Sequence, residues 1–336
     1  MSMTTLLTYN QHLALVCGAT GNVLLLYIIR TTASLDVKAY SRLLVLHSVV
    51  DLLFVFAFTV CSIKIITTER LLFLVVSGVL SDYGTLVGRI SILLYTMMVL
   101  LEITLIPIDY FYRYMLLCRN QKFTTTKFIY CFIGALGVSI FQNVIGNTCI
   151  EFGPTSDNIH YWKMITDKHP FDKLSPFAVY DPESNSKVQY NFITAVCIIV
   201  LCYSIVGYCT YQIRKTLLLN ERSRVRRESR RISAQITRVM IFQALLPCVV
   251  MCAPALMICA CFLIGVNVEQ AGELISILIH WMPTLKPIAT IYIVHPYRRA
   301  FLRKLHYSLA TETTVVSSNE ESSMKNTLSE PNEVYL

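Results

Sequence analysis

Charged residues are scarce in this chain. Asp, Glu, Lys and Arg make up 15% of its 336 residues, whereas hydrophobic residues make up 54%. Soluble domains carry about 25% charged residues, so this scarcity excludes an ordinary soluble protein and indicates an integral membrane protein. The apolar residues form long unbroken runs and not the alternating pattern of membrane strands, which excludes an outer-membrane barrel. We therefore expect helices that span a membrane.

Several processing and metal-binding signals are also missing. The chain has no C-x-x-C pair, so its cysteines predict neither a zinc site nor a redox site. Most of them lie in apolar runs, where a thiol acts as a small hydrophobic group. No N-x-[ST] sequon occurs, so N-glycosylation is not expected. The first residues lack the basic region of a cleavable signal peptide. We expect no metal, no cofactor and no catalysis.

Seven apolar segments are long enough to cross the roughly 30 Å of hydrocarbon in a bilayer. They are residues 12–29, 43–63, 85–112, 128–146, 190–213, 236–264 and 272–294. The predicted fold is therefore an all-α membrane protein, a seven-transmembrane helix bundle over residues 12–294. A further apolar run, 71–80, is too short to span and is expected to form a loop or a lid. The connection 147–189 is long for a bundle loop, which is typical of functional or disordered loops.

The basic residues predict the orientation of the bundle. Of the 29 Lys and Arg residues, 21 lie in the loops of one side and in the tail, seven lie on the other side, and Lys286 lies within a span. By the positive-inside rule, residues 1–11 are extracellular and the C-terminus is cytoplasmic. This distribution also argues against a nucleic-acid partner. Residues 295–309 are predicted to form a short amphipathic eighth helix on membrane lipids, followed by a disordered cytoplasmic tail, 310–336.

The third apolar segment carries charged residues along one face. Glu102 and Asp109 lie within it, and Arg113 lies at its end. At 100° per residue these three fall within about 40° of one another, and Ser91 and Tyr95 join the same line. Carboxylates are costly in hydrocarbon, so this seam should face protein or a wet cavity. The third helix is therefore expected to form the central axis of the bundle.

Prolines and a basic loop mark the later helices. Four prolines are expected to kink helices six and seven, which suits a bundle that changes shape: Pro247, Pro254, Pro283 and Pro287. The third cytoplasmic loop contains the run RKTLLLNERSRVRRESRR, which includes Arg226 and Arg227. This run is either a solvated topology signal or a surface for partner docking, and the two interpretations are compatible.

Particular strings resemble those of nematode serpentine chemoreceptors. Phe111-Tyr112-Arg113-Tyr114 is similar to the ending of their helix three, and Gln243-Ala244-Leu245-Leu246-Pro247 to a helix-six motif. The string PIATIYIVHPYR, residues 287–298, resembles their helix-seven ending P-x-x-T-x-Y-x-V-x-P-Y-R. Ser81-Asp82-Tyr83-Gly84 resembles a loop motif of the delta class (Srd) of the Str superfamily. The resemblance covers about residues 15–303.

This resemblance implies a rhodopsin-like G-protein-coupled receptor for chemosensation. It implies a small-molecule ligand, odorant or pheromone-like, a heterotrimeric G protein as partner, and a place in the plasma membrane of a sensory cilium. The expected G-protein-coupling residues are Tyr112, Arg113, Tyr114, Arg226 and Arg227. Arg113 has a simpler alternative, in which its side chain only anchors the helix at the interface.

Two features depart from the receptor pattern. The delta class has a cysteine just after Tyr-Gly, where this chain has Thr85. Cys149 therefore lacks the expected partner on helix three and is predicted to be free or joined to Cys61 or Cys17. The acidic residue usual before the helix-three arginine is also absent, and Asp109 is its nearest substitute.

A buried polar cluster is expected in the middle of the membrane. Asn22 and Asp51 resemble polar mid-membrane positions of the larger receptor class, and Glu102 lies at the level where that class binds a sodium ion. Lys286 stands directly before Pro287, so its ammonium is predicted to take the place of that ion. An unpaired ammonium at this depth costs at least about 2.5–3.5 kcal/mol. The alternative is that Lys286 extends toward the headgroups.

Individual residues also suggest three other functions. His47 and Asp51, together with His280, could suggest the metal site of a seven-span hydrolase, but metal sites need further ligands. A ligand-gated ion channel, or a subunit of one, would need polar residues through several spans. A retinal photoreceptor would use Lys286 as its Schiff base, but that lysine is expected too deep for a pocket that opens outward.

Overall fold

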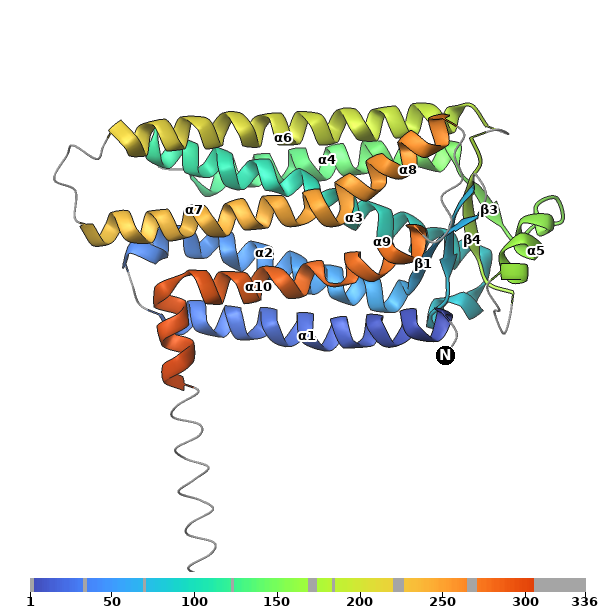
Figure 1. Ribbon diagram of the computed structural model, residues 1–336, viewed down its shortest axis with the longest axis horizontal. Coiled ribbons are helices and arrows are strands. Elements are labelled where there is room, and N and C mark those ends of the chain that lie inside the picture. Colours follow the sequence, from blue (N-terminus) through green and yellow to red (C-terminus); the bar gives the residue numbers. More distant parts are fainter. Residues whose placement is uncertain are drawn as a thin grey trace, which may run out of the picture.

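The computed structural model describes residues 3–32, 35–68, 71–121, 124–168, 174–182, 185–219, 227–264 and 271–304. These residues form a bundle of long, roughly parallel helices with a small sheet across one end (Figure 1). We call this the sheet end of the bundle, and α1 begins there. The predicted tail, 310–336, and the last residues of the predicted eighth helix lie outside the described residues.

Long apolar helices form the bundle. They are α1 (Met3–Thr31), α2 (Leu35–Cys61), α3 (Gly84–Leu117), α4 (Thr125–Cys149), α6 (Lys187–Leu219) and α7 (Arg227–Pro247), which continues through a π-helical turn (Cys248–Cys252) into α8 (Ala253–Ile264). Among the described residues, six helices are long and apolar enough to span a membrane. The pair α9 (Ala271–His280) and α10 (Met282–Ile293), bent by 43°, makes a seventh. The seven-helix fold predicted from the sequence is confirmed.

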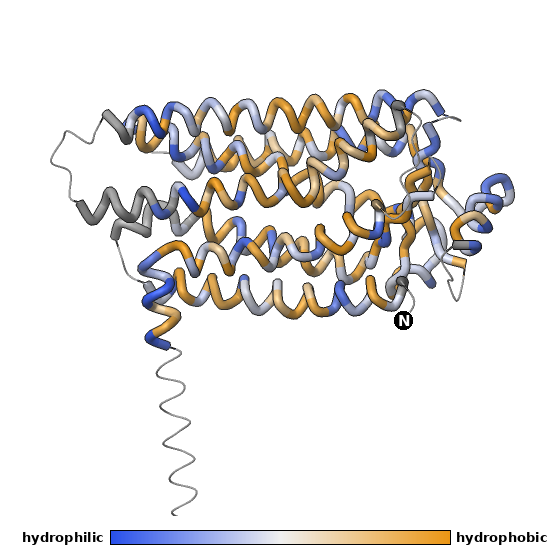
Figure 2. Tube along the Cα trace, viewed as in Figure 1, coloured by the Kyte–Doolittle hydropathy of each residue, from blue (hydrophilic) through white to orange (hydrophobic). Residues whose placement is uncertain are grey.

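The helices extend beyond their apolar runs. In particular, α1 begins at Met3, so most of the residues assigned to an N-terminal segment form its first turns. At the other end of α2, Ser62 has a φ of 44° and ends the helix, so Ile63 belongs to a strand and not to the predicted span. Apolar residues predominate along the helices, and hydrophilic residues gather toward the two ends (Figure 2).

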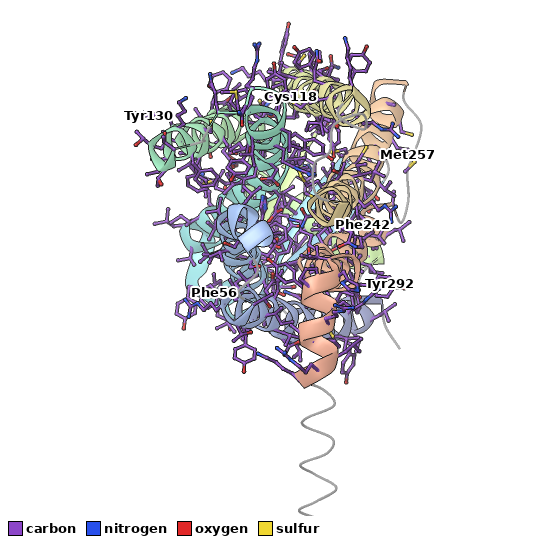
Figure 3. The ribbon with its side chains drawn as sticks, turned by 90° about the vertical axis from the view of Figure 1, so that its left-hand side faces the viewer. Phe56, Cys118, Tyr130, Phe242, Met257 and Tyr292 are labelled. Atoms are coloured by element: carbon purple, nitrogen blue, oxygen red, sulfur yellow. The ribbon has the colours of Figure 1, made fainter. Side chains whose placement is uncertain are left out.

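The bundle surface is apolar. Phe56, Tyr130 and Tyr292 point away from the bundle in the view along its axis (Figure 3), and each is about two-thirds exposed. Helices with such apolar outer faces are suited to contact with lipid. By contrast, α3 is buried on every side from Leu100 to Tyr110, which places it at the centre of the bundle.

A four-stranded antiparallel sheet, not predicted from the sequence, covers the sheet end. Its order is β1 (Ile63–Thr68), β2 (Leu71–Val76), β4 (Phe177–Tyr180) and β3 (Glu151–Gly153). The first two strands form the loop between α2 and α3, and the other two belong to the loop between α4 and α6. Pairing of β2 with β4 joins the two loops, with Phe73 opposite Val179. We call this sheet, together with the helix packed on its outer face, the lid. The run 71–80, expected to form a loop or a lid, supplies its strand β2.

The two faces of this sheet have different partners because side chains alternate along a strand. Phe73, Phe177 and Val179 face α5 (Ile159–Lys168) and pack against its Tyr161 and Ile165. The opposite face, which includes Leu74 and Tyr180, packs on the helix bundle. The lid therefore has a small hydrophobic core of its own.

Non-covalent contacts hold the lid to α3. Cys149 is free, as are Cys61 and Cys17, so the second loop has no disulfide to α3. Gly88 of α3 instead lies so close to Pro176 that a Cβ at Gly88 would stand 2.2 Å from the proline Cβ. One residue later, the Arg89 guanidinium donates to Asn147 Oδ1 at 2.8 and 3.1 Å and lies 4.6 Å from the ring centre of Phe152.

The short helix after α10 packs against the bundle end opposite the sheet. Residues 295–304 are helical and turn sharply away from the bundle axis (Figure 1). An amphipathic helix on lipid would turn its apolar side chains toward the membrane, but Tyr297 is buried in a cluster with Ile28 and Val239. Lys304 Nζ donates to Thr31 Oγ1 at 2.9 Å and lies 3.4 Å from the ring centre of Tyr27.

Candidate functional site

A cavity of about 260 Å³ lies beneath the sheet, between α3, α6, α8 and α9. This volume falls just below the range of about 300–1,000 Å³ usual for ligand pockets. Most of its walls are apolar. The lining residues are Ile65, Leu72, Leu74, Tyr95, Thr96, Val99, Ile103, Tyr180, Asn191, Phe192, Ala195, Val196, Ile199, Met251, Cys252, Ala255, Leu256, Ile258, Ile275 and Ile279.

Few polar atoms in this cavity are available to a ligand. Thr96 Oγ1 already donates to Asn143 Oδ1 at 2.7 Å, and Asn191 Oδ1 accepts from Gln142 Nε2 at 2.7 Å. The hydroxyl of Tyr95 is buried and has no hydrogen-bond partner among the described residues. A buried polar group without a partner is unfavourable, so this hydroxyl is suited to a polar atom of a bound molecule.

A smaller side cavity of about 110 Å³ adjoins the first between α3, α4 and α6. The two share Thr96, Tyr180 and Asn191 as lining residues. Gln142 and Asn143 also line the side cavity, and Gln142 Oε1 is buried with no hydrogen-bond partner in the part of the chain that the structure describes. Together the cavities offer an apolar space with an uncharged, amide-lined extension.

A π-helical turn shapes one wall of the main cavity. Pro254 has no N–H and its ring crowds the carbonyl four residues earlier. The N–H of Ala253 donates to the Cys248 carbonyl, five residues back, which gives the wider π turn. Met251 and Cys252 of this turn line the cavity. π turns inside α-helices often lie at functional sites.

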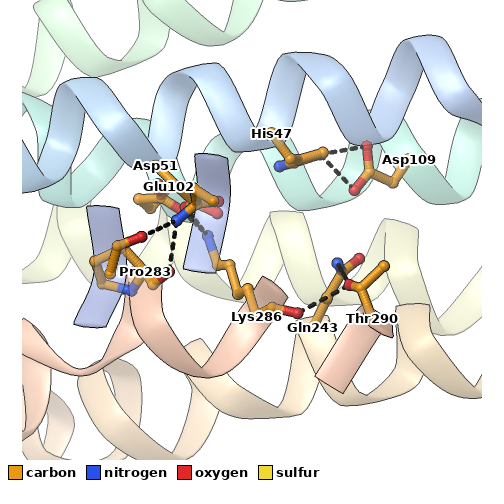
Figure 4. A network of polar contacts seen from close by, with 10 residues as sticks. His47, Asp51, Glu102, Asp109, Gln243, Pro283, Lys286 and Thr290 are labelled. Carbon is orange, nitrogen blue, oxygen red and sulfur yellow. Dashed lines mark hydrogen bonds and ion pairs between the residues drawn. The ribbon is translucent and has the colours of Figure 1, made fainter. Parts of the chain in front are cut away.

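Lys286 lies deeper in the bundle, where it binds two carboxylates. Its Nζ is 2.9 Å from Asp51 Oδ1 of α2 and also binds Glu102 Oε2 of α3 (Figure 4). All three residues are buried, so Lys286 does not extend toward the headgroups. The second oxygen of Glu102 accepts no hydrogen bond from the described residues. The structure thus brings together three of the four residues of the expected polar cluster.

The fourth residue, Asn22, binds the backbone of α10 instead. Pro287 lacks the N–H that would donate to the carbonyl of Pro283. Asn22 Nδ2 supplies that donor at 2.8 Å. Gly18 and Gly21 let α1 approach α10 closely: a Cβ at Gly21 would lie 3.2 Å from the Pro287 ring. Asn22 therefore stabilises the proline-containing segment that carries Lys286.

Both sides of α10 are occupied, which explains how Thr284 and Lys286 can both be buried. The Thr284 hydroxyl donates to the Ala14 carbonyl of α1, whereas Lys286 reaches α2 and α3. The 43° bend lies just before Pro283, and Pro247 directly precedes the π turn. The chain stays helical through Pro254 and Pro287.

Asp109 pairs with His47 of α2 and not with Arg113. The two ion-pairing atoms, His47 Nε2 and Asp109 Oδ2, are 2.7 Å apart (Figure 4). His280 Nδ1 binds the Ser276 carbonyl of its own helix. Among the described residues, no three His, Cys, Asp or Glu side chains are placed to hold a metal ion. The geometry therefore gives no support to the hydrolase alternative.

Arg113 connects α3 to α7 near the end opposite the sheet. Its Nη1 donates to Thr237 Oγ1 at 2.9 Å and contacts Met240 Sδ at 3.3 Å. The side chain is only 1% exposed, so it does not extend to the membrane surface in this structure. Tyr112 and Tyr114 are half-buried beside it. Arg226 lies outside the described residues, as does the side chain of Arg227.

Two more polar contacts hold α7. Gln243 Nε2 donates to Thr290 Oγ1 at 3.3 Å, and Thr290 in turn donates to the Lys286 carbonyl. Further along, Gln235 Oε1 accepts from the His295 N–H at 3.1 Å. The sequence did not predict these partners, the particular residues that line the cavity or the His47–Asp109 pair. The 3.6-residue spacing along α3 indicated only that Asp109 faces the interior of the bundle, not which residue it contacts there.

Comparison with known proteins places these features in a family. A family model described as serpentine type 7TM GPCR chemoreceptor Str matches residues 7–302. The crystal structure of squid rhodopsin has a similar fold, with a TM-score of 0.59 at 13% sequence identity, covering 90% of this chain and 85% of the squid chain. At that identity the likeness shows the fold alone. No curated protein sequence matches the chain.

Proposed function

We infer the function from one premise: this chain belongs to the Str family of serpentine seven-transmembrane G-protein-coupled chemoreceptors. We propose that it is a chemosensory receptor that binds a small molecule beneath the sheet and signals to a heterotrimeric G protein. Within the family we propose the delta class, because Ser81–Gly84 forms the turn into α3 and Gly84, with a φ of 87°, has a conformation suited to glycine.

The ligand we propose is uncharged and mainly apolar. The observation that carries this proposal is the cavity, where the only buried hydroxyl without a partner among the described lining residues is that of Tyr95. Among the described residues, no charged side chain lines either cavity. A molecule with an apolar body and one hydrogen-bonding group would fill the main cavity and reach Tyr95 or the Gln142 side cavity. Odorant or pheromone-like molecules are of this kind.

We propose that the sheet end faces outward and the opposite end faces the cytoplasm. The excess of Lys and Arg at the opposite end supports this orientation. The G protein would then meet the surface that carries Tyr112, Arg113 and Tyr114, together with Arg226 and Arg227 of the basic loop. A plasma membrane location, in a sensory cilium, follows from the proposed role.

Arg113 provides a switch between two packings of the bundle. In this structure it holds α7 against α3 through Thr237. A ligand in the cavity contacts the π turn that continues α7, so it can favour a second packing in which α7 moves away and Arg113 becomes available to the G protein. Such a switch needs only that the ligand bind the two packings with different affinity.

The test needs no known ligand. A hydrogen bond to a charged group contributes about 1.5–3 kcal/mol, so Thr237→Val should raise agonist-independent nucleotide exchange on a panel of Gα subunits about tenfold or more. Thr210→Val is the control, because within the described part of the chain that hydroxyl donates only to Val206 of its own helix. Arg113→Ala should abolish exchange, alone or with Thr237→Val, at normal surface expression. Equal rates of nucleotide exchange in the unmodified receptor, the three single variants and the double variant would contradict the switch.

A further inference from the structure

The lid lies directly over the ligand cavity. Four side chains of the sheet line it: Ile65, Leu72, Leu74 and Tyr180. On its other face the sheet is covered by α5, with Phe73, Phe177 and Ile165 fully buried between them. A molecule arriving from water on this side would have to separate two layers that share a hydrophobic core.

The cavity reaches the side of the bundle between α6 and α8. Ala255 and Leu256 of α8 line the cavity and are also exposed on the outer surface, Leu256 by 37%. Facing them, Ala195, Val196 and Ile199 of α6 line the cavity and are half-buried. An alanine on each helix leaves little side chain to close the gap. Both helices are membrane-spanning, so this opening faces lipid.

We propose that the ligand reaches the cavity from within the bilayer, through this gap between α6 and α8. The inference rests on the proposed function, since it concerns the same cavity. It also narrows the ligand class to uncharged molecules that partition into membranes. The surface around the gap suits such a path, because Met257, which points outward in Figure 3, and Val200 are apolar and exposed.

The neighbouring π turn favours opening at this place. Cys248–Cys252 departs from regular α-helical bonding directly before Ala255 and Leu256, so α8 can shift without breaking a regular hydrogen-bond ladder. Tyr203 Oη donates to the Ala244 carbonyl at 2.9 Å and holds α6 to α7 just below the turn. The gap therefore lies beside the irregular π turn, and the Tyr203–Ala244 hydrogen bond holds the two helices together just below it.

The experiment follows uptake of a photoactivatable eight-carbon alkanol carrying a diazirine. The purified receptor in lipid nanodiscs is mixed with the probe and illuminated at successive times, and labelled peptides are identified by mass spectrometry. We expect labelling on cavity residues such as Ile199 and Met251. Ala255→Trp should slow this labelling several-fold, and Leu256→Ala should speed it. Ala260→Trp, at an exposed residue of the same helix that neither lines the cavity nor belongs to the π turn, should leave it unchanged.

A second variant tests the path through the lid. Phe73→Cys with Val179→Cys places a disulfide across the β2–β4 seam, where paired Cα atoms lie within bridging distance. The oxidised and reduced forms both lack the Phe73 and Val179 side chains, so a difference between them reports the disulfide alone. Equal uptake in both forms supports access from the bilayer. Slower uptake only in the oxidised form, with no effect of Ala255→Trp, would overturn it. Absence of cavity labelling in every receptor, even at long times, would instead count against the proposed ligand site.

Discussion

Asn22 shows how a single side chain can satisfy a backbone group that a proline leaves without a donor. Its amide donates to the Pro283 carbonyl, which Pro287 cannot serve. Removing it should leave a buried acceptor unsatisfied, at a cost of about 1–3 kcal/mol. We expect Asn22→Ala to lower the melting temperature in detergent. In a Pro287→Ala background, residue 287 regains an N–H, and the same change should cost much less. Equal costs in both backgrounds would contradict this role, since any cavity effect cancels in the cycle.

Lys286 should be needed for assembly of the bundle, because its ammonium lies between the carboxylates of Asp51 and Glu102 and offsets their repulsion. Breaking a buried ion pair by removing one partner typically costs about 3–5 kcal/mol. We expect Lys286→Met to lower surface expression sharply, measured by labelling of intact cells. Adding Asp51→Asn or Glu102→Gln should restore part of it. Two carboxylates against one ammonium leave a surplus charge, so we also propose that one of them is protonated or shares a small cation. If neither double variant recovers, the cluster does not stabilise the fold.

Residue patterns predicted the α3 seam but not all of its partners. Glu102, Asp109 and Arg113 lie on one face because helical spacing alone determines it. Whether Asp109 pairs with Arg113 or with His47 depends on how α2 is rotated, and no local pattern carries that rotation. For the same reason Asn22 was grouped with the ions, although its donor goes to a backbone carbonyl.

At the scale of elements, the contact between α3 and the lid should be sensitive to the size of one residue. Gly88→Val would force Pro176 away, and overpacking of this kind costs about 1–3 kcal/mol. We expect a lower melting temperature and faster trypsin cleavage at Lys163, which lies on α5. Gly137→Val is the matched control, because no described atom beyond the local backbone of α4 lies within 4 Å of a Cβ at that glycine. The same loss of stability and the same cleavage rate in both variants would mean that the contact does not hold the lid.

The strands of the lid were not visible in the sequence. The apolar run of α2 extends to Ile63, the first residue of β1, and the left-handed conformation of Ser62 separates helix from strand. The apolar run 71–80 was recognised as too short to span, but its pairing partner, β4, lies in a distant loop. The full lengths of the helices could not be predicted from hydropathy either, because the turns that extend beyond the apolar runs are polar. Membrane spans follow from length and hydropathy, whereas a sheet between loops depends on contacts far apart in the chain.

For the molecule as a whole, the distribution of basic residues makes a simple topological prediction. An epitope placed before Met1 should be accessible to antibody in intact cells, and one after Leu336 only after permeabilisation. Each tagged receptor serves as the control for the other, because the same antibody is applied to both before and after permeabilisation. Accessibility of the C-terminal epitope in intact cells would reverse the bundle and place the Arg113 surface outside, where no G protein could reach it.

The pairing of β2 with β4 has a consequence for synthesis. Phe73 and Val179 are separated along the chain by all of α3 and α4, so the first hairpin emerges long before its partner strand exists. Until then, the apolar edge of residues 71–76 stays unpaired, and bare edges of this kind invite pairing with other chains. In the proposed orientation, newly made receptors should therefore require a chaperone on the lumenal side of the membrane until the second loop is translocated. Chains truncated after α4 should aggregate through that edge.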